Sequence, residues 1–373
     1  MAKNPSPQDA GPCWCGSGKQ YKICHRNRDK QIPIAPHKIV PEFRKAFSKK
    51  YCLHPQNSLG VCSTTIGRAH SVSASTALNC VAEEGHVLHF GIPSKDFLKS
   101  SGRFTVQPIG VNEASIFTGV CHLHDTQTFR LIDQPIQTLT GEHYFLLAYR
   151  SLSREIFTKA AAIASNEAAR NLDKGKDRAA QIAIQKFCQE RELGLQAGIQ
   201  DLHKHKAEFD ECLLRRDFDK ISHYTLELNH APQMVCSIGF TPEIDFHGNQ
   251  LQSLDDLETH VDLCTCSIIP TRRGGAIVFA WLNEPNGACS RLINSLEKLK
   301  PYLVPSAVVR LVFEHGENVF FSRSWWNSLD SDTQKILEVR ANSFYDKPAG
   351  TLLDDGFRPV LWSVVAKTRS GSK

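Results

Sequence analysis

The chain has 373 residues, of which 41% are hydrophobic and 22% charged, and its formal net charge is +5 at pH 7. This length exceeds that of a metal-dependent miniprotein and suffices for two or three domains with their own cores. No stretch has the apolar length needed to cross a bilayer, and residues 1–11 lack the apolar core of a secretory signal. We therefore expect a cytoplasmic protein that does not bind membranes.

The cysteine content points to metal ligands. The chain has 13 cysteines, an odd number, and without an export signal we expect reduced thiols, several of them bound to metal. The basic residues are interleaved with acidic ones through most of the chain, so the charge permits a nucleic acid partner without requiring one.

The most informative stretch is residues 13–25, Cys-Trp-Cys-Gly-Ser-Gly-Lys-Gln-Tyr-Lys-Ile-Cys-His. Two thiols one residue apart are followed by a Gly-Ser-Gly turn and a short basic run, which return Cys24 and His25 toward Cys13 and Cys15. Glycine adopts the positive φ angles that so short a loop requires. The pattern supplies four soft or borderline ligands and predicts a closed tetrahedral Zn²⁺ site.

This stretch resembles the SEC-C motif, the zinc-binding tail of the translocase ATPase SecA that is appended to many other bacterial proteins. The resemblance covers about the first thirty residues and implies a zinc knuckle over residues 1–30, with Cys13, Cys15, Cys24 and His25 as ligands. In SecA the module binds the chaperone SecB through a basic surface, so the resemblance implies a protein or SecB-like partner. A similar cationic face here would consist of Lys19, Lys22, Arg26, Arg28 and Lys30. Such a face can equally contact nucleic acid phosphates.

A second set of metal-ligand residues lies within residues 43–140, after a Pro-containing linker at residues 31–42 that we expect to leave the knuckle on a tether. We predict a second zinc site in which Cys52, with Cys62 or His54, provides ligands from a loop. Cys121 and His124 close the site as a C-x-x-H at a helix start. The alternative is that these thiols and imidazoles are ordinary packed or surface residues.

The same region is similar to HNH-type nucleases, in that His70 ends an expected strand and a C-x-x-H-Asp follows at Cys121 to Asp125. The resemblance implies that His70 is a general base and that His124 or Asp125 holds a divalent ion such as Mg²⁺. His124 cannot serve both this ion and a structural zinc. A metal-dependent nuclease acting in phage defence or as a toxin is therefore one hypothesis.

Two other hypotheses are compatible with this region. The pattern of strand end at His70, helix over 77–82, glycine stop at Gly85 and strand resembles some ADP-ribosyltransferase toxins, for which Glu142 or Glu155 would be the catalytic carboxylate. Alternatively, the zinc sites hold a non-enzymatic surface for a protein or chaperone partner. Walker-type phosphate loops and Gly-x-Ser-x-Gly elbows are absent from the sequence.

The rest of the chain completes an α+β fold. Apolar spacing over residues 141–230 predicts two long helices in a hairpin that breaks at residues 173–176, an arm of a kind that often mediates homo-oligomers. Residues 231–366 alternate strands and amphipathic helices, which indicates a mixed antiparallel sheet, and residues 367–373 are expected to be a disordered tail. The C-x-C at Cys264 and Cys266 could belong to a further metal site. We favour the interpretation that both are strand residues whose side chains face the same side of the sheet.

Overall fold

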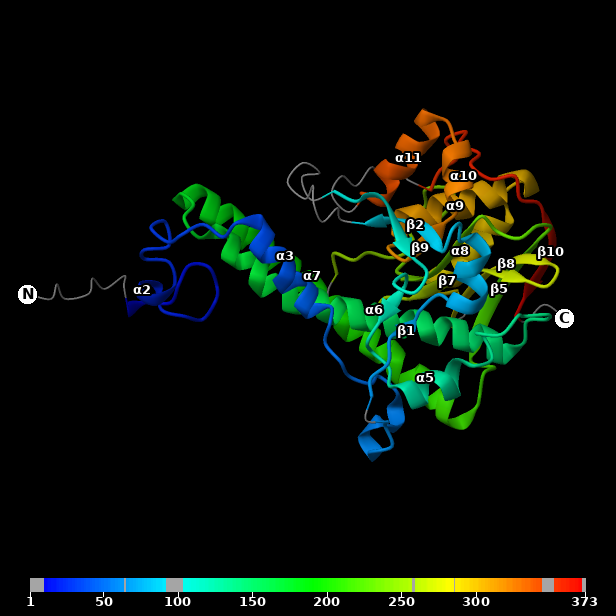
Figure 1. Cartoon of the computed structure of the whole chain (residues 1–373), viewed down its shortest axis with the longest axis horizontal. Coiled ribbons are helices and arrows are strands. Elements are labelled where there is room, and N and C mark those ends of the chain that lie inside the picture. Colours follow the sequence, from blue (N-terminus) through cyan, green and yellow to red (C-terminus); the bar gives the residue numbers. More distant parts are fainter. Residues whose placement is uncertain are drawn as a thin grey trace, which may run out of the picture. The chain divides into compact units, whose positions relative to one another are not determined.

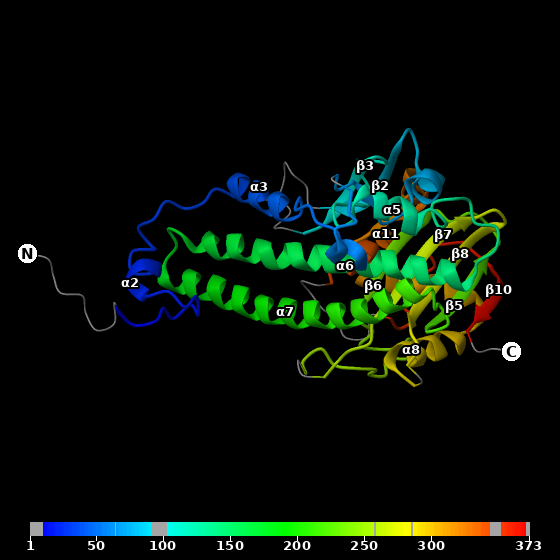
Figure 2. The same ribbon diagram turned by 90° about the horizontal axis from the view of Figure 1, so that it is seen from below.

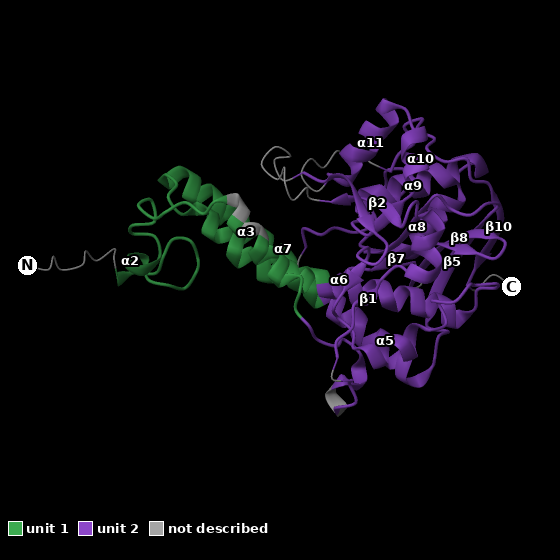
Figure 3. Ribbon diagram, in the orientation of Figure 1, with its two compact units in different colours: residues 1–49, 158–200 green, residues 50–157, 201–373 purple. Residues whose placement is uncertain are grey.

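The computed structural model describes residues 10–63, 65–91, 103–256, 259–284, 286–343 and 352–370. Its fold class is α+β, as the sequence predicted. The chain divides into two compact units, one of residues 1–49 and 158–200 and the other of residues 50–157 and 201–373 (Figure 3). Helices α6 (Gly141–Arg170) and α7 (Arg178–Arg215) contribute residues to both units.

The first unit consists of the N-terminal segment and of the parts of α6 and α7 nearest to the connection between the two helices. The two helices lie side by side (Figure 2), and within this unit Asn166 donates to the Cys188 carbonyl while Arg170 pairs with Glu192. The predicted hairpin is therefore present. Its connection includes the short helix η3 (Asn171–Asp173), and the N-terminal segment contributes α2 (Tyr21–Cys24) and α3 (Pro36–Ala46). Helix α3 thus occupies much of the segment that we expected to be a linker.

The second unit contains an eight-stranded antiparallel sheet (Figure 1). In spatial order its strands are β10 (Val364–Arg369), β5 (Ile221–Leu228), β8 (Gly274–Leu282), β7 (Cys264–Thr271), β6 (Met234–Phe240), β9 (Val319–Phe321), β2 (His86–Gly91) and β3 (Thr105–Gly110).

The sheet includes strands from three regions that we did not expect to contribute to it: the Cys/His-rich region, the helical arm and the C-terminal tail. Strands β2 and β3 come from the Cys/His-rich region, and β5 comes from the expected helical arm. Residues 367–369, expected in the disordered tail, instead pair with β5, with Arg369 opposite Tyr224. Backbone pairing to a neighbouring strand satisfies groups that an isolated polar tail leaves to water.

One face of the sheet packs against helices. Because side chains alternate along a strand, Cys236 and Ile238 of β6 point into this core, while Val235 and Ser237 point to the opposite face. The helices on the first face are α8 (Ala288–Glu297), α9 (Val304–His315), α10 (Arg323–Ser328) and α11 (Ser331–Ala341), with η4 (Pro301–Leu303) before α9. The buried side chains of these helices and of this face of the sheet form one continuous apolar core.

The opposite face holds α6 and the Cys/His-rich segments. Ser151 of α6 bonds Ser237 at 2.7 Å, and Tyr144 of α6 stacks on His223 with ring centroids 3.7 Å apart. The segments here are η1 (Pro55–Leu59), β1 (Ala69–His70), η2 (Ala74–Leu78), α4 (Asn79–Val81), β4 (Ile116–Phe117) and α5 (His122–Phe129), with β1 paired to β4. Among the described helices, none is both long enough and apolar enough to span a bilayer.

Candidate metal centres

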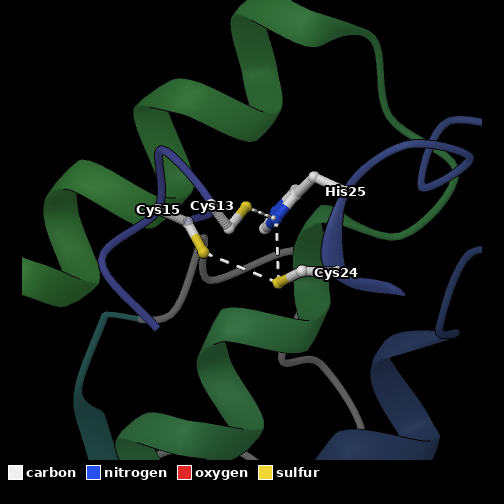
Figure 4. Close-up of side chains that lie close together, drawn as sticks. All are labelled: Cys13, Cys15, Cys24 and His25. Carbon is white, nitrogen blue, oxygen red and sulfur yellow. Dashed lines mark hydrogen bonds between the residues drawn. The ribbon is translucent and has the colours of Figure 1, made fainter. Parts of the chain in front are cut away.

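The first candidate centre is built from the N-terminal loop and helix α2 (Figure 4). A backbone bond from Cys13 to the Lys19 carbonyl closes the loop, and Gly16 and Gly18 take φ angles of 70° and 71°. This turn brings the two loop thiols, Cys13 and Cys15, to the end of α2, where Cys24 and His25 lie.

The spacing of these four side chains fits a tetrahedral ion. Their ligand atoms all lie within 4.8 Å of one another. His25 Nδ1 is 3.1 Å from Cys13 Sγ and 3.2 Å from Cys24 Sγ, and the Cys15 and Cys24 sulfurs are 3.6 Å apart. A tetrahedral zinc with Zn–S bonds of about 2.3 Å would place sulfurs about 3.8 Å apart. Three thiols and one imidazole are also the ligand types that zinc prefers.

The acidity of the thiols differs within this cluster. Burial raises the pKa of Cys13 to about 12. For Cys15 the effect of burial is outweighed by hydrogen bonds from Ser17 and from the neighbouring thiols, and its pKa is lowered. An ion would have to displace the remaining thiol protons, because zinc binds the thiolate. Binding at this centre should therefore release protons and weaken as the pH falls.

The second candidate centre joins two chain segments that are far apart in sequence. Cys52 and Cys62 flank η1, Cys121 is the N-cap of α5, and His124 lies in the first turn of that helix. His124 Nδ1 is 3.5 Å from Cys52 Sγ, 3.7 Å from Cys62 Sγ and 3.3 Å from Cys121 Sγ. In a tetrahedral site with ordinary Zn–S and Zn–N bonds these separations would be about 3.6 Å. The four ligand atoms again lie within 4.8 Å of one another.

The choice between His54 and Cys62 as the fourth member of this cluster follows from hydrogen bonding. His54 Nδ1 accepts from the Gln56 backbone at the start of η1, and the His54 ring stacks on His124 with centroids 3.8 Å apart. Burial lowers the pKa of His54 to about 4. His54 therefore packs against the ligand imidazole, and Cys62 completes the four-residue cluster.

A buried lysine lies beside this centre. A zinc ion with three thiolates and one neutral imidazole has a net charge of about −1. Lys206 of α7 is buried, donates to the Leu53 carbonyl at 2.7 Å and pairs with Asp210. Burial lowers the pKa of Lys206, while Asp210 and Cys52 raise it. The ammonium group thus lies beside the loop that carries Cys52.

The proposed catalytic residues His70 and Asp125 lie close enough to interact electrostatically. Neither belongs to a cluster of three or more potential metal ligands among the described residues. Burial lowers the pKa of His70 and raises that of Asp125. Arg150 lies near both and makes a two-bond ion pair with Asp133 at 2.7 and 2.8 Å. His124 Nδ1, the competing ligand in the nuclease hypothesis, faces the three thiols instead.

The remaining candidates have other contacts. Glu142 pairs with Arg216 at 2.9 Å and Glu155 with Arg154 at 3.2 Å. Cys264 and Cys266 of β7 both point into the helix-covered core, the arrangement favoured by strand alternation. Neither joins a metal-ligand cluster in the ranges that the structure describes.

Sequence reasoning missed the residues around each cluster. Lys206 was assigned to a solvated helix face, and Asp173 was taken only as part of the break between the two helices. Both are polar residues in a region identified by its apolar spacing, and such spacing carries no information about a partner distant in sequence. Arg28 was counted in the cationic face, but its guanidinium group is paired with the Asp173 carboxylate.

Comparison with known proteins identifies one part of the chain. The SEC-C motif matches residues 12–27, which include all four ligands of the first cluster. No curated protein and no solved structure matches the chain. The motif and the two Cys/His clusters make this a zinc-binding protein with a SEC-C knuckle at its N-terminal end.

The second cluster predicts different outcomes for two neighbouring residues. Replacing Cys62 with serine should remove one bound zinc ion per chain, because the hydroxyl group is a poor substitute for thiolate. Replacing His54 with alanine should leave the zinc content unchanged, since its ring stacks on a ligand without joining the cluster. Elemental analysis of the purified full-length variants measures this. Loss of zinc from the His54 variant with retention in the Cys62 variant would reverse the assignment.

Proposed function

We propose that the protein is a binding protein whose two zinc ions are structural. The observation that supports this best is the composition of the clusters, each of which offers three thiols and one imidazole. Four protein ligands fill a tetrahedral zinc shell, whereas catalytic zinc sites keep one position for water or substrate. The first ion would then stabilise the SEC-C knuckle, and the second would hold the loop of Cys52 and Cys62 against helix α5.

The surface proposed for a partner lies on the knuckle beside α2. Lys19, Lys22 and Ile23 are exposed, and Ile23 retains 69% of its accessible surface. Two cations around an exposed apolar side chain suit an acidic protein surface with an apolar pocket. Arg28 does not belong to this surface, because its side chain is only 13% exposed and is paired with Asp173.

Charge reversal on this surface tests the proposal. The double substitution Lys19→Glu and Lys22→Glu should weaken capture of an acidic protein partner by tenfold or more, which corresponds to about 1.4 kcal/mol. Capture by immobilised full-length protein, followed by mass spectrometry and titration of the captured protein, measures the effect. The charge-matched control Lys176→Glu and Lys186→Glu changes two other exposed lysines of the same unit.

Equal capture by both double variants would contradict the proposed surface. Capture that disappears after nuclease treatment and falls steeply with salt would identify nucleic acid as the partner instead.

A nuclease is the second candidate, and a specific observation favours it. His70 Nε2 and Asp125 Oδ1 are buried and have no hydrogen-bond partner in the described part of the chain. A neutral imidazole with an unpartnered nitrogen can accept a proton from a water molecule once water reaches it. A role in phage defence or as a toxin would depend on this activity. The ADP-ribosyltransferase hypothesis has less support, because both carboxylates named for it are engaged in ion pairs.

His70→Ala distinguishes the two candidates. If the protein cleaves DNA or RNA with added Mg²⁺, the variant should lose at least about 100-fold in rate, the usual contribution of a general base. Its zinc content and thermal unfolding should remain those of the wild type, as should the activity of His86→Ala, a change at an exposed histidine. If the protein only binds a partner, the wild type and both variants should show no cleavage. Cleavage that survives His70→Ala would rule out the role given to His70.

A further inference from the structure

The second ring nitrogen of His25 has a partner far away in sequence. His25 Nδ1 faces the thiols of the first cluster, and Nε2 lies 2.8 Å from Asp173 Oδ2 in the connection between α6 and α7. The His25 side chain is 1% exposed and that of Asp173 is 0% exposed. With Nδ1 directed at the ligand position, Nε2 carries the proton and donates it to the carboxylate.

Other groups fix the orientation of the Asp173 carboxylate. Arg28 Nε donates to Oδ1 at 2.6 Å and Gln185 Nε2 donates to Oδ2 at 2.7 Å. Gln185 is itself buried and also donates to the Arg170 carbonyl. The carboxylate is therefore held from the knuckle side by His25 and Arg28 and from the helix side by Gln185.

Further contacts within the same unit join the knuckle to the helix connection. Gln189 Nε2 donates to the Cys15 carbonyl at 2.6 Å, and the Gly175 amide donates to the Arg28 carbonyl at 2.9 Å. The Arg178 guanidinium lies 4.1 Å from the centre of the Trp14 ring. A Cβ at Gly175, where φ is +69°, would lie 2.6 Å from the Gln31 carbonyl oxygen. The knuckle is thus packed on the α6–α7 connection and not held only by its chain.

We propose that Asp173 is a positioning residue that couples zinc in the knuckle to the order of the α6–α7 connection. The carboxylate orients His25 for the ion, and the ion in turn holds the His25 ring against Asp173. The SEC-C knuckle, when it holds zinc, then stabilises the connected end of the helical hairpin. This inference rests on zinc binding by the first cluster, which the proposed function shares, but it does not depend on the partner surface.

The second cluster provides an internal reference. Its imidazole, His124, has a buried Nε2 with no hydrogen-bond partner among the described residues. Within the described ranges, a carboxylate therefore bonds the second ring nitrogen of the histidine in the first cluster and not in the second. A change at Asp173 should affect one of the two bound ions and leave the other unaltered.

The test compares Asp173→Asn with wild type as full-length, zinc-loaded proteins in a chelator competition. We expect the affinity of one ion to fall by about 10- to 100-fold, the usual effect of losing an outer hydrogen-bond partner of a ligand. The affinity of the other ion should stay within about twofold. Asp177→Asn is the matched control, because Asp177 lies near the same connection but caps α7 through the Ala180 amide.

A second measurement covers the case in which Asp173→Asn unfolds the knuckle. His25→Cys keeps four zinc ligands but removes the bond to Asp173. Amide hydrogen exchange over residues 170–178 should slow when zinc is added to wild type and respond much less to zinc in His25→Cys. Unchanged affinities in Asp173→Asn, or exchange in wild type that is insensitive to zinc, would overturn the coupling. A wild type whose first cluster binds no zinc would overturn the structural-zinc proposal as well.

Discussion

The requirement that four ligand atoms meet around one point constrains this structure in two places. The first cluster meets it locally, with all four residues inside a loop and one helical turn. The second must bring Cys52 to His124, 72 positions away in the chain. Closing so long a loop costs more entropy than closing the short one, although the cost grows only slowly with length. In both places an ion held by the cluster would add its binding free energy to folding, because the unfolded chain has no preformed site.

Helices α6 and α7 provide more than apolar packing. Lys206 places an ammonium group beside the second cluster, while Asp173 and Gln189 contact residues of the first. Gln185 donates to Asp173 and so holds its carboxylate. These polar residues are buried or half-buried and are satisfied by groups distant in sequence. A buried polar group without such partners would cost stability, so the clusters and the helices depend on one another.

The sequence predicted the features that depend on local spacing. The stretch at residues 13–25 was recognised as similar to the SEC-C motif, which matches residues 12–27, because ligand spacing and glycine turns are encoded in a short stretch. The helical hairpin followed from apolar periodicity, with its break where Asp173 lies. The gathering of Cys52, Cys62, Cys121 and His124 was predicted by ligand type, but only the fold separates Cys62 from the stacked His54.

Features that depend on distant pairing were not predictable in the same way. Strands β2 and β3 join the sheet of the C-terminal residues because β2 pairs with β9, and no local pattern specifies that partner. The bond from His25 to Asp173 is equally invisible in sequence, since either residue alone is an ordinary exposed type. The helix over residues 36–46 was not predicted, because its prolines indicated a linker. One of these prolines lies at the helix start, where proline is well tolerated.

Zinc-edge X-ray absorption of the purified full-length protein, combined with elemental analysis, tests the central claim most directly. Two closed clusters of three thiols and one imidazole predict two zinc ions per chain. The average first shell should then contain three sulfurs at about 2.3 Å and one nitrogen at about 2.0 Å. A single zinc per chain, or a first shell with oxygen from water in place of sulfur, would contradict the account of two structural zinc sites.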